Sequence, residues 1–281
     1  MKYVLYNPLA NSNKGEEGMK KAVELLHTES KVFNVVGFDI KKFFDELTEE
    51  DEVYIVGGDG TLNRIINALD DKFPSNPIYL YSAGSGNDFL KDTNEENSVF
   101  FRINKYLDNL PVVRVKGKEY YFINNAAFGI DGYCCEVGDK LREANAKKID
   151  YTKIAIKGLL FHFKRVQCTV EVDGKTFKYK HTWLAPTMNG RYMGGGMMIA
   201  PNQDRLNEQG NLTNIVYHTK TKIMALINFP SIFKGTHVNK KGICTIHTGK
   251  RIKVTFSRPT AMQIDGETVS DVLEYEAWSR R

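Results

Sequence analysis

The chain has 281 residues, of which 42% are hydrophobic and 26% are charged, and this composition predicts a folded protein large enough for two domains. The net charge of +5 suits an anionic ligand or an anionic membrane surface, but no basic run carries interleaved aromatic residues, so we expect no nucleic acid partner. The four cysteines lack the density of a disulfide scaffold and the C-x-x-C spacing of a zinc site, and we expect reduced thiols in a cytoplasmic protein. We expect no signal peptide before Asn7-Pro8 and no bilayer-spanning segment, because the apolar runs are too short.

The first third of the sequence alternates strand and helix patterns, which predicts a parallel sheet with crossover helices. The predicted strands are residues 2–6, 32–36, 52–56 and 78–81, and the predicted helices are residues 16–27, 40–47 and about 62–69. Glycine-rich segments follow the third and fourth predicted strands. Because open α/β sheets bind their ligands beyond the carboxyl ends of the strands, these two segments form the candidate ligand site.

The first glycine-rich segment, residues 57–61, reads Gly-Gly-Asp-Gly-Thr. Glycines allow the backbone to approach a phosphate, and a following helix directs free N–H groups at an anion. The carboxylate of Asp59 would repel that anion unless a divalent cation or backbone donors accompany it. A glycine-rich turn can also be only a tight connection. The second segment, residues 84–88, reads Gly-Ser-Gly-Asn-Asp and favours a binding site.

After about residue 111 the sequence changes to β-type segments with turn signals, which predicts a second, mainly antiparallel domain. The predicted strands are residues 112–115, 120–125, 168–172, 176–186, 212–217, 242–248, 251–256 and 261–264. One predicted helical segment, residues 140–165, interrupts them and combines many lysines and arginines with an apolar patch.

Six motifs follow one another along the chain: Asn7-Pro8, Gly57-Gly58-Asp59-Gly60-Thr61, Gly84-Ser85-Gly86-Asn87-Asp88-Phe89, Phe122-Ile123-Asn124 with Gly129, Gly194-Gly195-Gly196 with Ala200-Pro201, and Ile264-Asp265-Gly266-Glu267. In this order they resemble the diacylglycerol kinase catalytic-domain family, which includes bacterial lipid kinases and the sphingosine kinases. The Gly-Gly-Asp-Gly-Thr motif alone is shared with NAD kinases and phosphofructokinases. The ordered set therefore carries the resemblance.

The resemblance implies a doubly wound α/β nucleotide-binding domain over residues 1–111 and an antiparallel β-sandwich domain for the lipid substrate over residues 112–271. It leaves open that residues 272–281 return to the first domain. It further implies ATP and Mg²⁺ as cofactors, with a lipid hydroxyl meeting the γ-phosphate between the domains. The expected ATP-binding residues are Asn7, Lys14, Gly57, Gly58, Gly60, Thr61, Gly84, Ser85, Gly86 and Asn87.

The candidate catalytic residues are three acids. By similarity Glu267 is the general base and Asp265 its magnesium ligand or positioning partner, while Asp59 either holds Mg²⁺ or orients the acceptor hydroxyl. Asp88 is a further candidate metal ligand. Asp265 and Glu267 lie two residues apart, which would point both carboxylates to one face of an extended strand. Gly266 equally allows a turn, in which both acids would be ordinary solvated loop residues.

The sequence departs from the family pattern at Gln209 and Asn214, where relatives usually have acids. Some relatives bind a structural metal in this region, and the loss of two charges is expected to weaken such a site. The Ser82-Ala83 pair also replaces a proline that usually precedes the second glycine loop, which is expected to affect rigidity more than chemistry.

The favoured function is an ATP- and Mg²⁺-dependent kinase of diacylglycerol or a similar lipid alcohol, which associates peripherally with the inner face of the membrane. A homodimer is left open. An NAD kinase-type enzyme with a soluble substrate is disfavoured by the second glycine loop and the Asp-Gly-Glu motif, and a non-catalytic nucleotide- or lipid-binding member by the retained acids. The expected membrane-facing segment is residues 140–165, where Lys147 and Lys148 belong to a basic cluster around an apolar stretch. The alternative is a solvated helix packed on the second domain.

Overall fold

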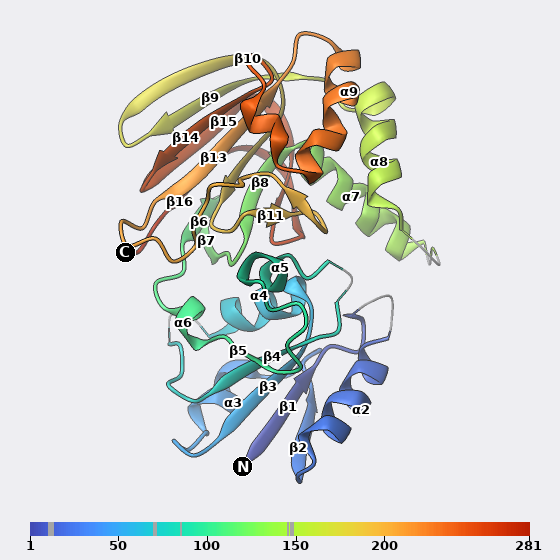
Figure 1. Ribbon diagram of the computed structural model, residues 1–281, viewed down its shortest axis with the longest axis vertical. Coiled ribbons are helices and arrows are strands. Elements are labelled where there is room, and N and C mark those ends of the chain that lie inside the picture. The colour runs from blue at the N-terminus through green and yellow to red at the C-terminus, as the bar shows by residue number, and fades with distance from the viewer. Residues whose placement is uncertain (11–13, 70–71, 85, 145, 147–148) are drawn as a thin grey trace. The chain divides into compact units, whose positions relative to one another are not determined.

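The computed structural model describes residues 1–281 except 11–13, 70–71, 85, 145 and 147–148. The described residues form two compact units, Met1–Asp108 and Asn109–Arg281 (Figure 1). Within the described part of the chain, no helix has the length and apolar character needed to cross a membrane. The predictions for Ser85, Lys147 and Lys148 lie outside the described residues.

The first unit is built on a five-stranded sheet with the strand order β2-β1-β3-β4-β5. Its strands are β1 (Lys2–Tyr6), β2 (Ser30–Asn34), β3 (Glu52–Gly57), β4 (Ile78–Ser82) and β5 (Phe101–Arg102). The first four strands pair in parallel, and β5 pairs with β4 in the antiparallel sense. The helices are α2 (Gly15–Leu26), α3 (Ile40–Asp45), α4 (Asp59–Ala68), α5 (Asp88–Thr93) and α6 (Asn104–Leu107). This confirms the predicted α/β class of the N-terminal domain.

Burial explains why β3 occupies the centre of this sheet. Its residues from Val53 to Val56 are all buried, as expected for a parallel strand that is covered on both faces. The helix that follows, α4, buries Leu62, Ile65 and Ile66, a spacing that places them on one face. Strand and helix together fix the loop between them at the carboxyl edge of the sheet.

The second unit is built on a nine-stranded antiparallel sheet in the order β14-β13-β10-β8-β15-β16-β6-β7, with β9 paired to both β10 and β15. Its strands are β6 (Val112–Val115), β7 (Lys118–Tyr121), β8 (Asn125–Gly129), β9 (Val166–Val172), β10 (Lys175–Met188), β13 (Leu212–His218), β14 (Cys244–Gly249), β15 (Arg251–Ile264) and β16 (Glu267–Trp278). The long strands β10 and β15 pair with β9 over one part and with β8 over another. The sheet therefore closes around a core, which confirms the predicted β-sandwich class.

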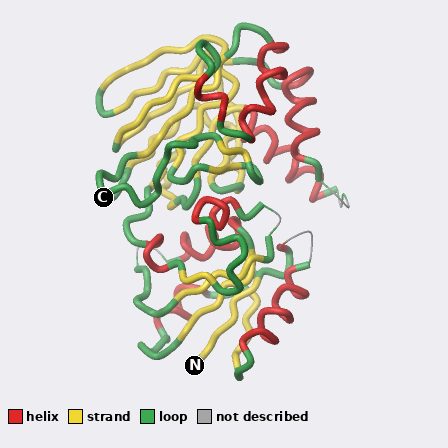
Figure 2. Tube along the Cα trace, in the orientation of Figure 1, coloured by secondary structure: helices red, strands yellow, loops and turns green. Residues whose placement is uncertain are grey.

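Aromatic side chains fill this core. The rings of Phe128 and Phe256 stack with centroids 4.3 Å apart, and Tyr275 lies against them while its hydroxyl donates to the carbonyl of Ala185. A second buried cluster, which includes Leu159 and Trp183, lies between the sheet and the helices that Figure 2 shows gathered beside it. These helices are α7 (Ile130–Glu143), α8 (Tyr151–Lys157), the π-helix η1 (Gly158–His162), α9 (Lys222–Phe233) and the 3₁₀-helix η2 (Thr236–Asn239).

Several segments differ from the sequence predictions. The predicted helix 140–165 corresponds to the end of α7, to α8 and to η1, and α9 was not predicted. The two strands predicted at 251–256 and 261–264 are one strand, β15, because a register shift between Thr255 and Thr260 accommodates the intervening residues. Residues 272–278 belong to β16, which pairs with β15 and β6. The return of residues 272–281 to the first unit, left open from the sequence, is therefore not found.

Candidate active site

Close backbone packing requires glycine at Gly57 and Gly58 of the first glycine loop and at Gly84 of the second. A Cβ atom on Gly57 would lie 2.5 Å from the side chain of Thr61, and a Cβ atom on Gly84 would lie 2.5 Å from the Cα atom of Gly58. The loops after β3 and β4 thus touch backbone to backbone. Only glycine permits this approach, and it leaves the amide groups of both loops at the same edge of the sheet.

Asp59 connects the two glycine loops. Its carboxylate accepts hydrogen bonds from the backbone N–H groups of Asp88 at 2.8 Å and of Phe89 at 3.0 Å. These are the first two residues of α5, so the carboxylate stabilises the free donors and the positive end of that helix. The aspartate thus finds backbone donors in the second loop.

The second loop is shaped by Asn87. Its backbone has a φ of 51°, in the left-handed region that asparagine tolerates better than most residues, and its side-chain amide donates to the carbonyl of Gly84 at 3.0 Å. The carboxylate-bearing Asp88 follows and is buried. The structure thus brings together Asp59, Asn87 and Asp88.

Asn7 and Lys14 flank the loop after β1. The side-chain oxygen of Asn7 accepts the N–H of Leu9 at 3.0 Å, and its carbonyl accepts the N–H of Ala10 at 3.1 Å. A Cβ atom on Gly15 would lie 1.8 Å from the carbonyl oxygen of Asn7, so glycine is required where α2 begins. Lys14 is exposed and precedes this helix, next to residues outside the described part of the chain.

In the second unit, Asp265 is buried and organises a distant segment. Its carboxylate accepts hydrogen bonds from the backbone N–H groups of Ile123 at 2.6 Å, Asn124 at 2.8 Å and Asn125 at 2.9 Å. These residues lead into β8, at the centre of the sheet. Asp265 therefore fixes the path of the chain into the core.

The Asp265-Gly266 pair forms the tight turn between β15 and β16. Both residues have positive φ values, 47° and 95°, and Ile264 pairs with Glu267 across the turn. This geometry is that of a two-residue hairpin for which Asp-Gly is a preferred sequence. Because the chain turns here, the two carboxylates separate: Asp265 is buried and Glu267 is exposed. The turn, rather than the extended arrangement, is the form found.

Asp131 is an acid that the sequence interpretation missed. It is buried at the start of α7, and Gln263 donates to its carboxylate at 2.6 Å. Burial raises the pKa of Asp131 to about 6, and the hydrogen bond from Gln263 opposes the shift in part. The oxygen of the same Gln263 amide accepts the N–H of Gly266 at 2.6 Å. Asp131 is thus linked to the Asp265-Gly266 turn, and its position two residues after Gly129 of a family motif was the available signal.

The two parts of the chain match two described families. Residues 2–109 match the diacylglycerol kinase catalytic domain, and residues 124–275, more than half of the chain, match the YegS C-terminal NAD kinase beta sandwich-like domain. The chain belongs to the diacylglycerol kinase catalytic-domain family. Its sequence is 26% identical over 255 residues to a diacylglycerol kinase from Mycobacterium tuberculosis, covering 86% of this chain and 81% of the relative. A crystal structure of a diacylglycerol kinase from Bacillus anthracis has the same fold, with a TM-score of 0.66 and 18% identity over 99% of this chain and 93% of that one.

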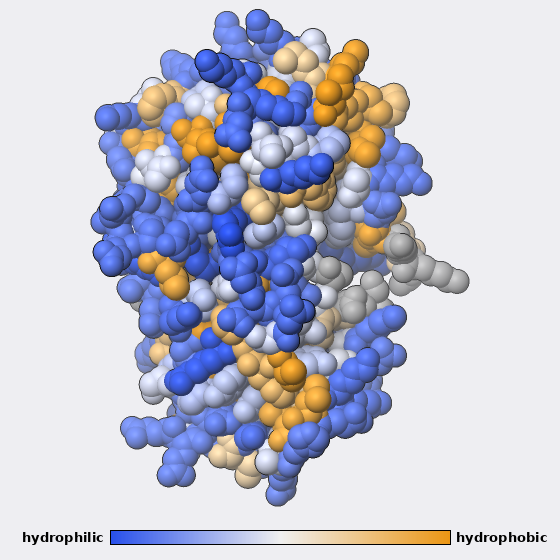
Figure 3. Space-filling view, viewed as in Figure 1, coloured by the Kyte–Doolittle hydropathy of each residue, from blue (hydrophilic) through white to orange (hydrophobic). Residues whose placement is uncertain are grey.

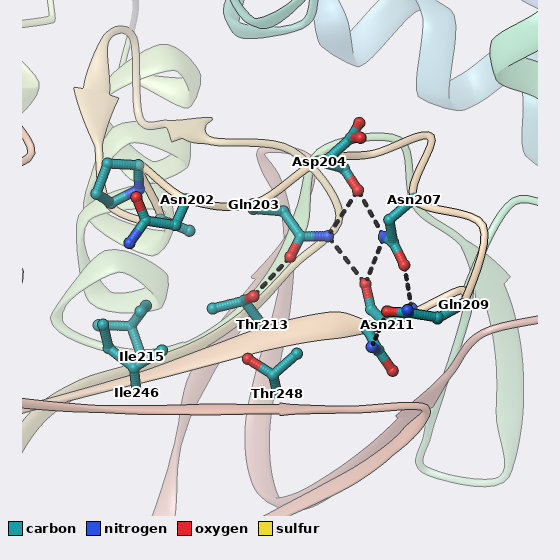
Figure 4. Close-up of a pocket in the computed structure, with 12 residues that line it drawn as sticks. Asn202, Gln203, Asp204, Asn207, Gln209, Asn211, Thr213, Ile215, Ile246 and Thr248 are labelled. Atoms are coloured by element: carbon teal, nitrogen blue, oxygen red, sulfur yellow. Dashed lines mark hydrogen bonds between the residues drawn. The ribbon is translucent and has the colours of Figure 1, made fainter.

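This family member has a pocket of about 300 Å³ in its second unit, beside β13 and β14, lined by amide and hydroxyl side chains together with Ile215 and Ile246 (Figure 4). The amide nitrogen of Gln203 donates to the backbone carbonyls of Asn189, Asp204 and Asn211 at 3.3, 3.4 and 3.0 Å, while its oxygen accepts from Thr213. Side-chain amides therefore hold the loop around this pocket. Within the described residues, no group of three or more His, Cys, Asp or Glu side chains is placed to hold a metal ion.

The departures from the family pattern at Gln209 and Asn214 have different surroundings. Gln209 lines the pocket, and its side-chain oxygen accepts from the amide of Asn211 at 3.2 Å. Asn214 is fully buried and donates to the carbonyl of Pro186 at 2.9 Å. An aspartate at position 214 has no N–H to donate to that carbonyl, which explains why an amide suits this position.

Proposed function

We propose that the protein is an ATP-dependent lipid kinase that transfers the γ-phosphate to the hydroxyl of diacylglycerol or a similar lipid alcohol. The observation that carries this proposal is the bond from Asp59 to the start of α5, which joins the two glycine loops at the carboxyl edge of a parallel sheet. Membership of the kinase family supports the use of ATP at this edge. We further propose that the enzyme meets its lipid acceptor as a peripheral protein at the cytoplasmic face of a membrane.

The backbone of the two glycine loops suits the phosphates of a nucleoside triphosphate. Gly57, Gly58, Gly60 and Thr61 of the first loop and Gly84, Ser85, Gly86 and Asn87 of the second are the proposed phosphate-binding residues, with Asn7 and Lys14 at the adjoining loop. Glycine-rich turns expose backbone N–H groups that bind phosphate oxygens. The starts of α2 and α4 add the positive ends of helices to the same edge.

The donor set at the loops fits Mg²⁺. Asp59 and Asp88 supply hard oxygen donors in two adjoining segments, and Mg²⁺ in such enzymes is usually held by one or two carboxylates together with substrate phosphates. When bound, the ion would neutralise charge on the transferring phosphoryl group. Asp59 would hold it directly or through water. Asp265 was a further candidate ligand, but its three backbone hydrogen bonds support a positioning role.

Glu267 is the proposed general base, because it is exposed and follows a turn that Asp265 and Gln263 hold in place. A carboxylate on a rigid hairpin can accept the proton of an acceptor hydroxyl without rearranging the backbone. Asp131 is the second acid near this turn. With a pKa raised to about 6 by burial, it is partly protonated near neutral pH and can accept or donate a hydrogen bond.

The test is phosphorylation of a panel of acceptors with labelled ATP. The panel contains diacylglycerol, a sphingoid base, monoacylglycerol and NAD, each with and without Mg²⁺. We expect label in diacylglycerol or a related lipid and none in NAD. Label in NAD would establish the NAD kinase-type alternative, and no label in any acceptor despite measurable ATP binding would favour a non-catalytic member.

A further inference from the structure

Helix α9 is apolar along nearly its whole length but is only partly covered by the rest of the unit. After Lys222 its sequence, IMALINFPSIF, contains no charged residue, and the helix buries Ala225 and Ile232. Ile223 and Ile227 are 68% and 71% exposed. They lie four residues apart, so they project from the same face of the helix into solvent.

The π-helix η1 and the preceding helix α8 extend this apolar surface. Phe161 of η1 is 73% exposed and Ile156 of α8 is 38% exposed. The ammonium group of Lys222 donates to the carbonyl of Leu160 at 2.6 Å, which joins the start of α9 to η1. We call the exposed side chains of Ile156, Phe161, Ile223, Met224 and Ile227 the α9–η1 face. Figure 3 shows hydrophobic residues gathered in this region of the molecule.

The two segments that carry the α9–η1 face are basic, and the nearby acids are Asp150 at the start of α8 and those of α7. Residues 151–167 and 219–242 contain nine lysines and arginines and no aspartate or glutamate. They therefore contribute more positive charge than the net +5 of the whole chain. The lysines in these two segments are all exposed, namely Lys153, Lys157, Lys164, Lys220, Lys222, Lys234, Lys240 and Lys241.

We propose that the α9–η1 face inserts its side chains into a bilayer that contains anionic phospholipids. Transfer of exposed isoleucine and phenylalanine side chains from water into the bilayer lowers their free energy, and the surrounding lysines are attracted to anionic headgroups. A second copy of the chain fits this face poorly, because it would bring two sets of like charges together. The inference deepens the proposed function by naming the surface through which a lipid kinase reaches its substrate.

This assignment overlaps with the expectation drawn from the sequence and extends it, because α8 and η1 lie within residues 140–165 whereas α9 does not. The sequence predicted the membrane contact at residues 140–165, with Lys147 and Lys148 in its basic cluster. These two lysines lie outside the described residues. The structure assigns the apolar part of the contact mainly to α9 and η1, because these elements hold the most exposed isoleucine and phenylalanine side chains. The amphipathic helix α7 packs against β15 and β16 instead.

Vesicle co-sedimentation of the full chain tests the proposal. The probes are vesicles of phosphatidylcholine alone and of phosphatidylcholine with phosphatidylglycerol, each at low and high salt. One variant combines Phe161→Ser, Ile223→Ser and Ile227→Ser, and its matched control combines Leu25→Ser on α2 with Leu273→Ser on β16, both exposed leucines. A charge variant combines Lys153→Gln, Lys157→Gln and Lys220→Gln, and its control combines Lys178→Gln and Lys180→Gln on β10.

We expect each lost apolar side chain to weaken binding to the anionic vesicles about tenfold, and each lost lysine about fivefold at low salt and less at high salt. The control variants should bind like the wild type, and all variants should keep the wild-type melting temperature. The proposal is overturned if the apolar variant sediments with anionic vesicles as the wild type does. It is equally overturned if light scattering shows a wild-type dimer that the apolar variant loses.

A second measurement separates this inference from the proposed function. Phosphorylation of a dispersed short-chain diacylglycerol needs the active site but no bilayer, so the apolar variant should match the wild type in this assay and lose activity only on vesicles. If no variant phosphorylates any lipid while vesicle binding changes as expected, the docking face stands and the proposed reaction fails.

Discussion

Asp59 in the first unit and Asp265 in the second make the same kind of hydrogen bond but differ in burial. Each lies beside a glycine, and each accepts backbone N–H groups from a segment far away in the sequence. Asp265 is buried and serves three such donors, whereas Asp59 is only partly buried and serves two at a helix start. The comparison indicates that a motif aspartate can be mainly structural in one domain and remain accessible to a ligand in the other.

Glu267, the exposed acid next to the buried Asp265 turn, has the largest expected effect on turnover. Glu267→Gln keeps the size of the side chain and removes the proton acceptor, so we expect a loss of about 10²–10⁴ in kcat with ATP affinity nearly unchanged. Steady-state kinetics and ATP binding measure the two effects. If ATP affinity falls strongly and the rate at saturating ATP survives, Glu267 is a nucleotide ligand rather than the base.

Asp59→Asn tests the accessible member of the pair. The amide retains one oxygen for the start of α5 but places an NH₂ group against the other backbone donor, which should cost about 1 kcal/mol of stability. Removal of the charge should lower kcat by about 10²–10³, because charge neutralisation at the transferring phosphoryl group is weakened. Wild-type turnover with Mg²⁺ and ATP would refute a role in the reaction.

Asp265→Asn tests the buried member. Its carboxylate faces three backbone donors, so an amide nitrogen there leaves buried N–H groups facing one another, and we expect a loss of about 3 kcal/mol in the free energy of unfolding. Urea denaturation measures it, with the exposed Asp45→Asn as the matched control. A variant that loses turnover but keeps full stability would mean that Asp265 acts chemically and that the comparison with Asp59 is wrong.

Asp131→Asn should appear as a pH dependence of the free energy of unfolding. The folded protein holds the proton of Asp131 up to about pH 6, whereas the unfolded chain releases it near its ordinary pKa of 3.8. Wild-type stability relative to the variant should therefore fall as the pH rises from about 4 to 6 and stay level above that, by up to roughly 3 kcal/mol in total. Denaturation of both proteins at pH 4, 5, 6 and 7 measures this, and a difference that does not change with pH contradicts the prediction.

The sequence predicted elements best where periodicity and burial agree. The central strand β3 and the helix α4 were predicted within a few residues, because their apolar spacing matches a buried strand and a one-faced helix. Helix α9 was not predicted, because its apolar residues surround the helix and give no one-sided pattern. Strand β15 was split in two because Pro259 falls at a register shift that no local signal indicates.

The candidate site was predictable as a set of residues but not as a set of contacts. The motifs located Asp59, Asp265 and Glu267, yet the partners of both aspartates are 29 or more residues away and depend on how the strands are ordered. Asp131 carries the same lesson, since its raised pKa depends on burial by the folded sheet. Local sequence patterns cannot predict hydrogen-bond partners or burial that depend on residues far away in the chain.

The bond from Asp59 to the start of α5 also bears on the entropy of the proposed nucleotide binding. It closes a segment of about thirty residues whose ends are already brought near by the pairing of β3 with β4, so little further chain freedom is lost in forming it. The freedom of both loop ends is thereby reduced during folding, before any nucleotide arrives. A triphosphate that binds here consequently finds the donors of two separate segments already arranged, and more of its interaction energy is expressed as affinity.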